Sequence, residues 1–224
     1  MKGGRESMNF NELETLIKSR RSIRVWEKKA VPESLLTQAI ELATYAPNAG
    51  NQQNWHFYVI TNPKTITAIA DGVQQSADAM AGWPEVDKLG EAAKAQLKRS
   101  SSFRNAPVLI AVAASQYSSP VEQVMALREK VDPQAKAMRE WRGIANSKIQ
   151  SVSSAIAYLL LILHQMGLGA VWMTGPIQAK GAIEKVIKVP EGSDIVALIP
   201  VGYPAEKPPM KDRKAVNLVC EFMK

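Results

Sequence analysis

Residues 147–166, SKIQSVSSAIAYLLLILHQM, decide the architecture of this chain, because they are apolar on almost every side of a helix. A helix of that composition belongs in the centre of a core or at an interface between subunits. Gly167 follows directly and marks the end of the helical pattern. We therefore expect one central helix, with the rest of the fold built around it.

The remaining composition indicates a single soluble domain. Of the 224 residues, 46% are hydrophobic and 22% are charged, which is ordinary for a globular protein. The longest apolar runs, 106–114 and 155–163, have nine residues each, less than half of the roughly 20 that span a bilayer. No apolar segment follows the charged N-terminus, so no secretory signal is predicted. We expect a cytoplasmic protein without membrane contact, with a flexible leader at 1–8 and one domain at 9–224.

The scarcity of cysteine and histidine excludes several kinds of site. Cys220 is the single cysteine, so an intramolecular disulfide and a cysteine-rich metal site are ruled out. His56 and His164 lack the spacing of metal ligands, and neither accompanies the GxSxG turn of a hydrolase. His164 lies on the apolar helix and is interpreted as a packed histidine. We predict no metal site and no Ser-His chemistry.

The net charge of +7 indicates an anionic partner. The Lys and Arg residues are spread along the chain, and no sequence motif of nucleic-acid binding is present. We therefore favour a phosphorylated cofactor and expect no nucleic-acid partner. The alternative, a basic nucleic-acid binder, would show steeply salt-dependent binding.

Apolar periodicity and capping residues predict an α+β fold in which helices far outweigh strands. The expected helices, the first capped by Asn9 and the second opened by Pro32 at its first position, are 10–19, 32–45, 63–81, 85–101, 147–166 and 178–187. The expected strands are 55–61, 107–114, 170–174 and 195–201, with an extended tail from Ala215. Residues 117–146 have weak periodicity and two prolines, so we interpret them as a mobile lid or a partner-facing insertion.

Arginine side chains gather after the first expected helix, in the motif RRSIR that begins at Arg20. If the chain is extended there, Arg20, Ser22 and Arg24 share one face, since side chains alternate along a strand. Two guanidiniums and a hydroxyl suit a phosphate; the alternative is a solvated basic segment at a helix C-terminus. Lys211 and Arg213 repeat the spacing, which alone is typical of a surface pair. Because chain termini often lie close together, both sets can meet at one anion.

Two uncharged segments could contact a ligand ring. Residues 46–55, APNAGNQQNW, hold three Asn and two Gln, whose amides donate and accept hydrogen bonds; the alternative is a plain turn leading into a strand. Residues 167–175, GLGAVWMTG, fail as a dinucleotide fingerprint, because their glycines end a helix and precede a strand. At the exit of that strand, Thr174 and Gly175 can present backbone N–H groups to a ligand.

Taken in order, these segments resemble the nitroreductase family, from Met8 to nearly the end of the chain. The motifs that carry the resemblance are RRSIR (20–24), APNAGNQQNW (46–55), MGLGAVWMTG (166–175), PVGYPAEKP (200–208) and KDR (211–213). The resemblance implies a nitroreductase-like α+β fold, with a mostly antiparallel central sheet wrapped by helices, in an intertwined homodimer. It also implies two FMN molecules in the subunit interface and NADPH or NADH as the electron donor.

The resemblance assigns cofactor contacts to particular positions. Arg24 is expected at the N1–C2=O edge of the flavin, where a cation stabilises the charge that reduction adds. Trp141, in the lid, is expected on the substrate side. The other positions are Arg20, Arg21, Ser22, Lys211 and Arg213 for the phosphate and ribityl chain, Pro47, Asn48, Ala49 and Asn51 for the flavin of the partner subunit, and the backbone of Met173, Thr174 and Gly175 for flavin N5.

The implied activity is hydride transfer from NAD(P)H, in a ping-pong cycle, to a small electron-poor acceptor such as a nitroaromatic, a quinone or an enone. Asn48, Ala49, Asn54 and Thr174 depart from the residues common in the family, so they leave the acceptor preference open. One alternative is a flavin-dependent dehalogenase or dehydrogenase on the same fold. Another is a non-catalytic FMN-binding protein, which would bind flavin without oxidising NAD(P)H.

Overall fold

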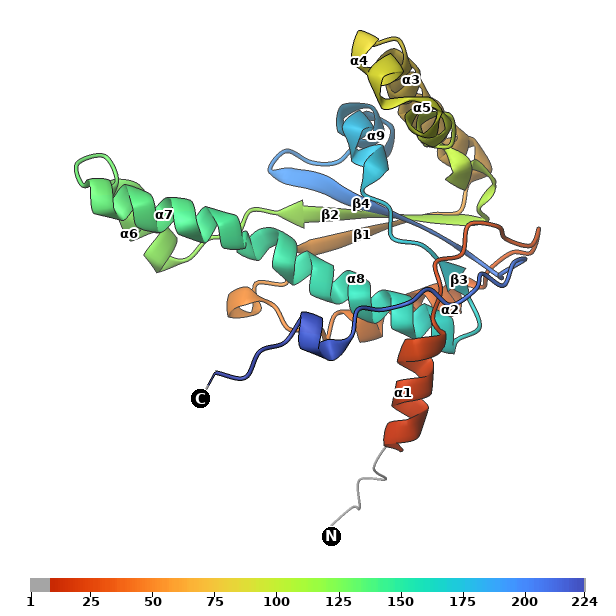
Figure 1. The fold of residues 1–224 in the computed structure, drawn as a ribbon, viewed down its shortest axis with the longest axis horizontal. Coiled ribbons are helices and arrows are strands. Elements are labelled where there is room, and N and C mark those ends of the chain that lie inside the picture. Colours follow the sequence, from red (N-terminus) through yellow and green to blue (C-terminus); the bar gives the residue numbers. More distant parts are fainter. Residues whose placement is uncertain (1–8, 224) are drawn as a thin grey trace.

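The computed structural model describes residues 9–223, so the predicted leader at 1–8 lies outside the described residues. The described chain is an antiparallel sheet with helices on both faces (Figure 1). Its helices are α1 (Phe10–Ser19), α2 (Glu33–Ala43), α3 (Pro63–Ala81), α4 (Pro84–Leu89), α5 (Glu91–Lys98), α6 (Pro120–Arg128), α7 (Pro133–Ala145), α8 (Ser147–Gln165) and α9 (Lys180–Ile187). Its strands are β1 (Trp55–Ile60), β2 (Val108–Ser115), β3 (Gly169–Ala170) and β4 (Ser193–Gly202). The predicted α+β class is confirmed.

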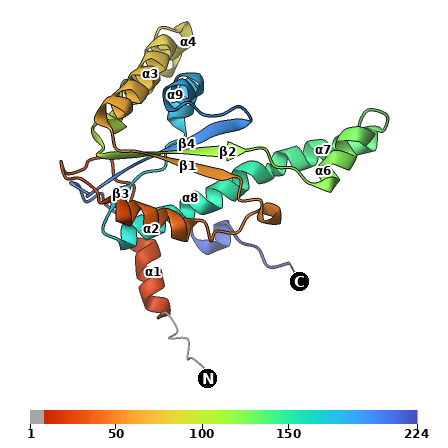
Figure 2. The ribbon, with the colours of Figure 1, turned by 180° about the vertical axis from the view of Figure 1, so that it is seen from behind.

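The four strands lie in the order β1-β2-β4-β3, and each neighbouring pair is antiparallel. Along β2, Ile110 and Val112 join the core on the side of α2 and α8, while Leu109 and Ala111 join the core on the side of α3 and α9. Figure 2 shows the two helical layers from behind. Because both faces of the strand are covered, its sequence is continuously apolar instead of alternating.

Helix α8 occupies the centre of one layer, as its sequence predicts. Asn146 caps its start by accepting the N–H of Ile149 at 3.2 Å, and Gly167, with φ 77°, follows its end. One side of α8 is buried in the core. On the other side Tyr158 is 42% exposed. The central helix of one chain is therefore only half covered.

Four elements differ from the sequence-based prediction. The helix expected at 85–101 is two helices, separated at Gly90, where φ is 77° and ψ is −170°. The strand expected at 170–174 is limited to β3 and an isolated bridge between Met173 and Leu198. Pro32 is the N-cap of α2 and not its first residue. The tail beyond Ala215 contains a 3-10 turn at Val216–Leu218 and is otherwise irregular.

Residues 117–146 are regular, contrary to the prediction. They form the hairpin α6–α7, which projects from the body at one end of α8 (Figure 1). Both prolines that were interpreted as interruptions open a helix, each after a capping Ser119 or Asp132. Ion pairs Arg142–Glu122 and Arg139–Glu129 join the two helices. Whether this hairpin moves as a lid stays a prediction.

Among residues 9–223, no helix combines the length and the apolar character that crossing a membrane requires. Within the same range, no three His, Cys, Asp or Glu side chains gather as they would around a metal ion.

Candidate functional site

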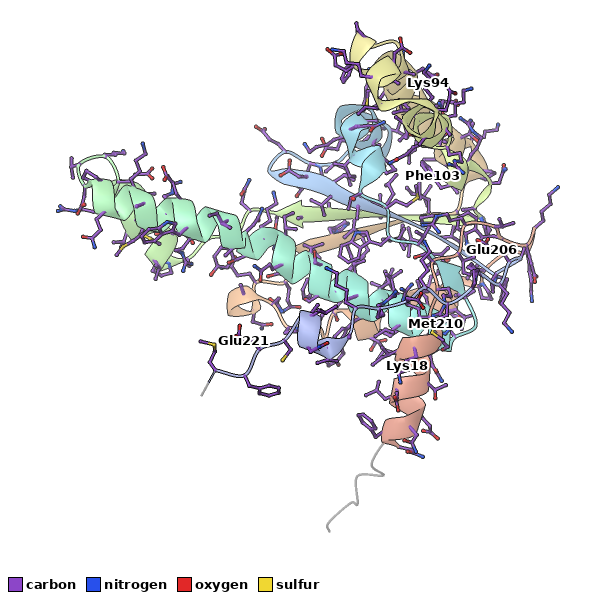
Figure 3. The ribbon with its side chains drawn as sticks, in the orientation of Figure 1. Lys18, Lys94, Phe103, Glu206, Met210 and Glu221 are labelled. Carbon is purple, nitrogen blue, oxygen red and sulfur yellow. The ribbon has the colours of Figure 1, made fainter. Side chains whose placement is uncertain are left out.

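The two basic segments from opposite ends of the chain meet at one cavity of about 460 Å³. It lies where the end of α1 and the segment after β4 approach the outer side of α8. Figure 3 shows Lys18 and Met210, two of its residues, close together at this junction. The lining residues are Ile17, Lys18, Arg20, Arg21, Ala157, Leu160, Leu161, Trp172, Met210, Lys211 and Arg213. The cavity is therefore cationic at one wall and apolar at the other.

The charge of Arg20 is not balanced by a carboxylate. Within residues 9–223, Arg20 takes part in no ion pair. Partial burial lowers the pKa of Arg20, and the neighbouring charges of Arg21 and Arg213 lower it further. Cations held together without a counter-ion repel one another, and a bound anion removes that repulsion. The arrangement is suited to a phosphate.

Arg21 has a different role from Arg20. Its Nη1 donates to the carbonyls of Lys18 and Arg20 at 2.6 and 2.7 Å, at the C-terminal end of α1. This is the helix-end cation that the alternative interpretation of the motif described. Arg213 similarly donates to the carbonyls of Lys211 and Asp212 at 3.2 Å, which are contacts within the second basic segment itself.

Ser22 and Arg24 lie beyond the cavity. The backbone is extended there, as predicted, because Ile23 donates its N–H to the carbonyl of Ala170 at 3.1 Å and Ser22 forms a bridge with the same residue. Arg24 is exposed, and its backbone N–H donates to the carboxylate of Glu206. Neither side chain lines the cavity with Arg20, so their predicted flavin contacts stay predictions.

A buried indole at this cavity has an unused hydrogen-bond donor. Trp172 Nε1 is buried without a partner among the described residues, and an unsatisfied buried donor is rare in native proteins. The next residue, Met173, exchanges both backbone hydrogen bonds with Leu198 at 2.9 and 3.0 Å. The exposed Thr174 and Gly175 follow. No hydrogen bond from their N–H groups is formed within residues 9–223. These donors are available to a ligand.

The amide-rich segment is not brought to the basic cavity within one chain. Ala49 donates its N–H to Ser151 Oγ at 3.1 Å, and Ser154 Oγ donates to the carbonyl of Pro47 at 2.6 Å. These two serines precede the cavity residues Ala157, Leu160 and Leu161 on α8 by three to ten positions, a separation of about 5–15 Å along the helix axis. Thus the two predicted halves of the site lie at different levels of the same helix.

Within the amide segment, most of the polar groups of Asn48 serve the loop itself. Its Oδ1 accepts the N–H of Gln53 at 2.9 Å, and its Nδ2 donates to the carbonyl of Ala46 at 3.3 Å. Asn51 has a left-handed backbone with φ 50°, a conformation that asparagine tolerates. The plain-turn interpretation therefore explains Asn48. The exposed Asn51 side chain accepts from Gln53 Nε2 at 3.4 Å through its Oδ1, which leaves its Nδ2 for a ligand.

The lid residue Trp141 is 65% exposed on α7. A second cavity, of about 610 Å³, lies at the base of the hairpin and does not include Trp141. Its lining is strongly charged and consists of Gln116, Tyr117, Glu122, Glu129, Lys136, Arg139, Glu140, Arg142, Gly143, Asn146, Ser147 and Lys148.

Sequence reasoning missed Lys18 and Met210 as cavity residues. Lys18 lies three positions before Arg21, a spacing that places both on one side of a helix, so the signal was present. Met210 directly precedes the second basic pair and had no distinguishing signal of its own.

The fold and this cavity define an α+β protein with a cationic site for a phosphorylated ligand, built from both ends of its chain. The family model "Nitroreductase family" matches residues 17–203. The chain therefore belongs to the nitroreductase family, and the resemblance carried by its five motifs is confirmed.

Individual proteins agree with this assignment. A putative NADH dehydrogenase/NAD(P)H nitroreductase of Methanothermobacter thermautotrophicus is 30% identical over 88% of this chain and 79% of its own length. A BluB-like flavoprotein of Clostridium difficile has a TM-score of 0.83 at 26% identity, covering 97% of this chain and 100% of its own. An oxidised iodotyrosine deiodinase bound to FMN and 3-iodo-L-tyrosine has a TM-score of 0.67 at 25% identity, covering 91% and 95%.

Proposed function

We propose that this chain is an FMN-dependent oxidoreductase that moves hydride from NADPH or NADH to a small electron-poor acceptor. The observation that carries the proposal is the cationic cavity, in which Arg20, Lys211 and Arg213 gather without a balancing carboxylate. Membership of the nitroreductase family and the FMN in the related deiodinase structure support the same cofactor. The cofactor preference between NADPH and NADH is part of what the experiment below decides.

The residues present fit FMN. Cations at one wall of the cavity suit a phosphate dianion, and the apolar wall formed by α8 suits an uncharged chain or ring. The unpaired indole N–H of Trp172 and the free backbone N–H groups of Thr174 and Gly175 suit acceptor atoms of a heterocycle. This donor set contains no proton acceptor aligned for general-base work.

The chain's own contribution to catalysis is orientation and charge. When bound, FMN would supply the hydride chemistry between NAD(P)H and the acceptor, in the ping-pong order that we propose. Arg20, Lys211 and Arg213 hold the phosphate, and Arg24 provides fixed positive charge for an anionic edge of the ring. The backbone at Thr174 and Gly175 donates hydrogen bonds that orient the ring. No side chain is required to carry a proton.

The proposal includes a homodimer in the cytoplasm, with each FMN held between two subunits. The α8 residues that hold the amide segment, Ser151 and Ser154, precede the cavity residues Ala157, Leu160 and Leu161 by three to ten positions, or about 5–15 Å along the helix axis. A second subunit that brings its own amide segment to this cavity would complete the site. The half-exposed outer side of α8 offers the surface for that contact.

The decisive experiment is the visible spectrum of the purified protein, followed by anaerobic mixing with NADPH and with NADH. We expect a bound-flavin absorption band that bleaches with one or both donors, and the faster donor is the physiological one. Protein that stays colourless after FMN is added would contradict the proposal. A bound band that neither donor bleaches would favour a non-catalytic flavin-binding protein.

A second candidate, reductive dehalogenation on the same fold, is favoured by the charged cavity of the α6–α7 hairpin. Glu122 and Glu129 there already pair with Arg142 and Arg139. Glu140 and Lys136, which form no ion pair within residues 9–223, suit the ammonium and the carboxylate of a zwitterionic amino acid. The related deiodinase binds 3-iodo-L-tyrosine. Adding 3-iodo-L-tyrosine to the dithionite-reduced protein would release iodide and reoxidise the flavin if this candidate is correct.

A further inference from the structure

His164 contacts the residue that directly precedes the phosphate-binding arginine. Its Nε2 lies 2.9 Å from Oγ of Ser19, the last residue of α1. The Ser19 hydroxyl also lies 3.2 Å from the carbonyl of Leu16, to which it donates. With its hydrogen used there, the hydroxyl accepts from His164, so the imidazole carries its hydrogen on Nε2. Among residues 9–223, this is the one side-chain hydrogen bond between α1 and α8.

The position of this hydrogen bond lets it fix the orientation of Arg20. Elsewhere α1 and α8 face each other mainly through Leu13, Leu16, Leu161 and Ile162, with the polar side chains of Glu12 and Gln165 beside them. Apolar packing allows a helix to slide or rotate by small amounts, whereas a directional hydrogen bond fixes one orientation. Because Ser19 and Arg20 are consecutive, the hydrogen bond fixes the backbone position from which the Arg20 side chain extends.

The charges around His164 favour its neutral form. Partial burial lowers the pKa of His164, and the positive charges of Arg20 and then Arg21 lower it further. The charged groups that share cavities with the imidazole are Glu12, Glu14, Lys18, Arg21, Glu206 and Lys207. Two of the carboxylates are already engaged, since Glu14 pairs with Lys18 and Glu206 accepts the backbone N–H groups of Arg24 and Val25.

We propose that His164 is a positioning residue of the phosphate site, which aligns Arg20 through Ser19 and takes up a proton when a phosphate dianion binds. This inference rests on the proposed FMN site, although inorganic phosphate is sufficient to test it. A dianion beside Arg20 and Arg21 cancels the field that opposes protonation, so the pKa of His164 rises on binding. By linkage, protonation of His164 strengthens phosphate binding by the same factor. This contribution is therefore gained as the pH falls and lost as the pH rises through the pKa of the liganded state.

Two substitutions separate the positioning role from the proton uptake. His164→Ala removes both, and we expect FMN to bind about 2- to 10-fold more weakly, the range of one neutral hydrogen bond. His164→Gln places an amide N–H close to the position of Nε2, and we expect affinity near that of the wild type at alkaline pH. The affinity ratio of wild type to His164→Gln should then rise as the pH falls. His56→Ala, at an exposed position of β1, is the matched control.

The FMN phosphate itself gains its second proton near pH 6, which changes the affinity of every variant alike. Dividing the wild-type affinity by that of His164→Gln cancels this shared effect. Affinities are read from quenching of FMN fluorescence, and riboflavin, which lacks the phosphate, should show no pH-dependent ratio. Unchanged FMN affinity in His164→Ala, or a flat ratio for His164→Gln, would overturn the inference.

A direct measurement uses the fact that the chain has two histidines. Their imidazole carbon-bound protons are followed by NMR against pH, with and without saturating inorganic phosphate, and His56→Ala assigns the signals. We expect phosphate to raise the pKa of His164 and to leave that of His56 unchanged. If the His164 signal responds to phosphate but FMN does not bind, the oxidoreductase proposal fails and this inference stands. If FMN binds but phosphate leaves the pKa of His164 unchanged, this inference fails and the oxidoreductase proposal stands.

Discussion

At the scale of single residues, Arg20 shows the conflict between stability and binding. Its guanidinium is partly buried beside Arg21 and Arg213, and these charges lower its pKa. Such a cluster destabilises the unliganded protein, because like charges repel more strongly where water is partly excluded. A sequence selected only for stability would place a carboxylate here, so the cluster is best explained by a ligand.

Arg20→Ala should therefore separate binding from stability. Removing a charge-assisted hydrogen bond of about 1.5–3 kcal/mol should weaken FMN binding roughly 10- to 100-fold, while riboflavin binding stays the same. The melting temperature of the ligand-free variant should not fall, because repulsion is relieved. Fluorescence titration and thermal unfolding measure both, with Arg99→Ala, on the distant α5 end, as the control. An equal loss of FMN and riboflavin binding would show that Arg20 does not contact the phosphate.

At the scale of elements, one charge network joins the beginning of α8 to β4 and α9. Asp194 at the start of β4 pairs with Lys148 of α8, and with Lys180 of α9 at 2.9 Å. Glu184 pairs with Lys180 at 3.0 Å and accepts the N–H of Ile195 at 2.9 Å. Hydrogen bonds from Lys148, and then from Lys180, lower the pKa of Asp194. The network connects the two helical layers across one end of the sheet.

Asp194→Asn should destabilise the protein in a pH-dependent way. The folded pKa of Asp194 lies below that of the unfolded chain, about 3.9, so its contribution is present above that value and is lost as the pH falls through the folded pKa. Because the carboxylate is 38% exposed, we expect a loss of at most about 1 kcal/mol at pH 7. Urea unfolding at pH 7 and near pH 3 measures it. A loss of equal size at both values would contradict the electrostatic origin.

A second element-scale prediction concerns the close approach of β3 to the strand-like segment after α1. A Cβ on Gly169 would lie 2.8 Å from the Ile23 side chain, closer than packed atoms allow. Gly169→Ala should therefore displace residues 22–24, destabilise the protein by about 1–3 kcal/mol and weaken FMN binding. Gly143, inside α7, has open space at the same position, so Gly143→Ala should stabilise the protein by up to about 1 kcal/mol. Thermal unfolding of both variants measures these changes in stability. Equal changes in the two variants would refute the steric argument.

At the scale of the whole molecule, a single chain leaves extensive apolar surface uncovered. The exposed apolar side chains include Tyr158 on α8, Val124 and Leu127 on α6, and Phe222 in the tail. Large apolar side chains exposed on α6, α8 and the tail are the kind of surface that a partner subunit would cover. Together with the separation of the amide segment from the basic cavity, this surface favours the proposed dimer with shared sites.

Mixed dimers should test whether each site is shared. Arg20→Ala and Asn51→Asp, the latter keeping a residue that tolerates the left-handed backbone, should each bind FMN weakly as homodimers. In a dimer of one variant with the other, one site carries both substitutions and the other carries neither. Copurification through two different affinity tags, followed by measurement of bound flavin, should recover one strong site per mixed dimer. The absence of recovery would place Arg20 and Asn51 at the same subunit's site.

The sequence by itself determined the features that are local. The apolar periodicity of 147–166 predicted α8 because a stripe of side chains is encoded by spacing alone, and the continuous run at 108–114 predicted a covered strand. The RRSIR motif predicted an extended basic segment. Where two local rules competed, the prediction was wrong. Pro120 and Pro133 were interpreted as interruptions, although proline is also favoured in the first turn of a helix.

Only the tertiary structure decided which residues meet. The cavity that joins Arg20 to Arg213 depends on packing between segments almost two hundred positions apart, for which spacing gave only a hint. The unpaired indole N–H of Trp172 and the contact of His164 with Ser19 depend on where another element lies. Burial and hydrogen bonding are properties of neighbours in space, and a linear pattern does not encode them.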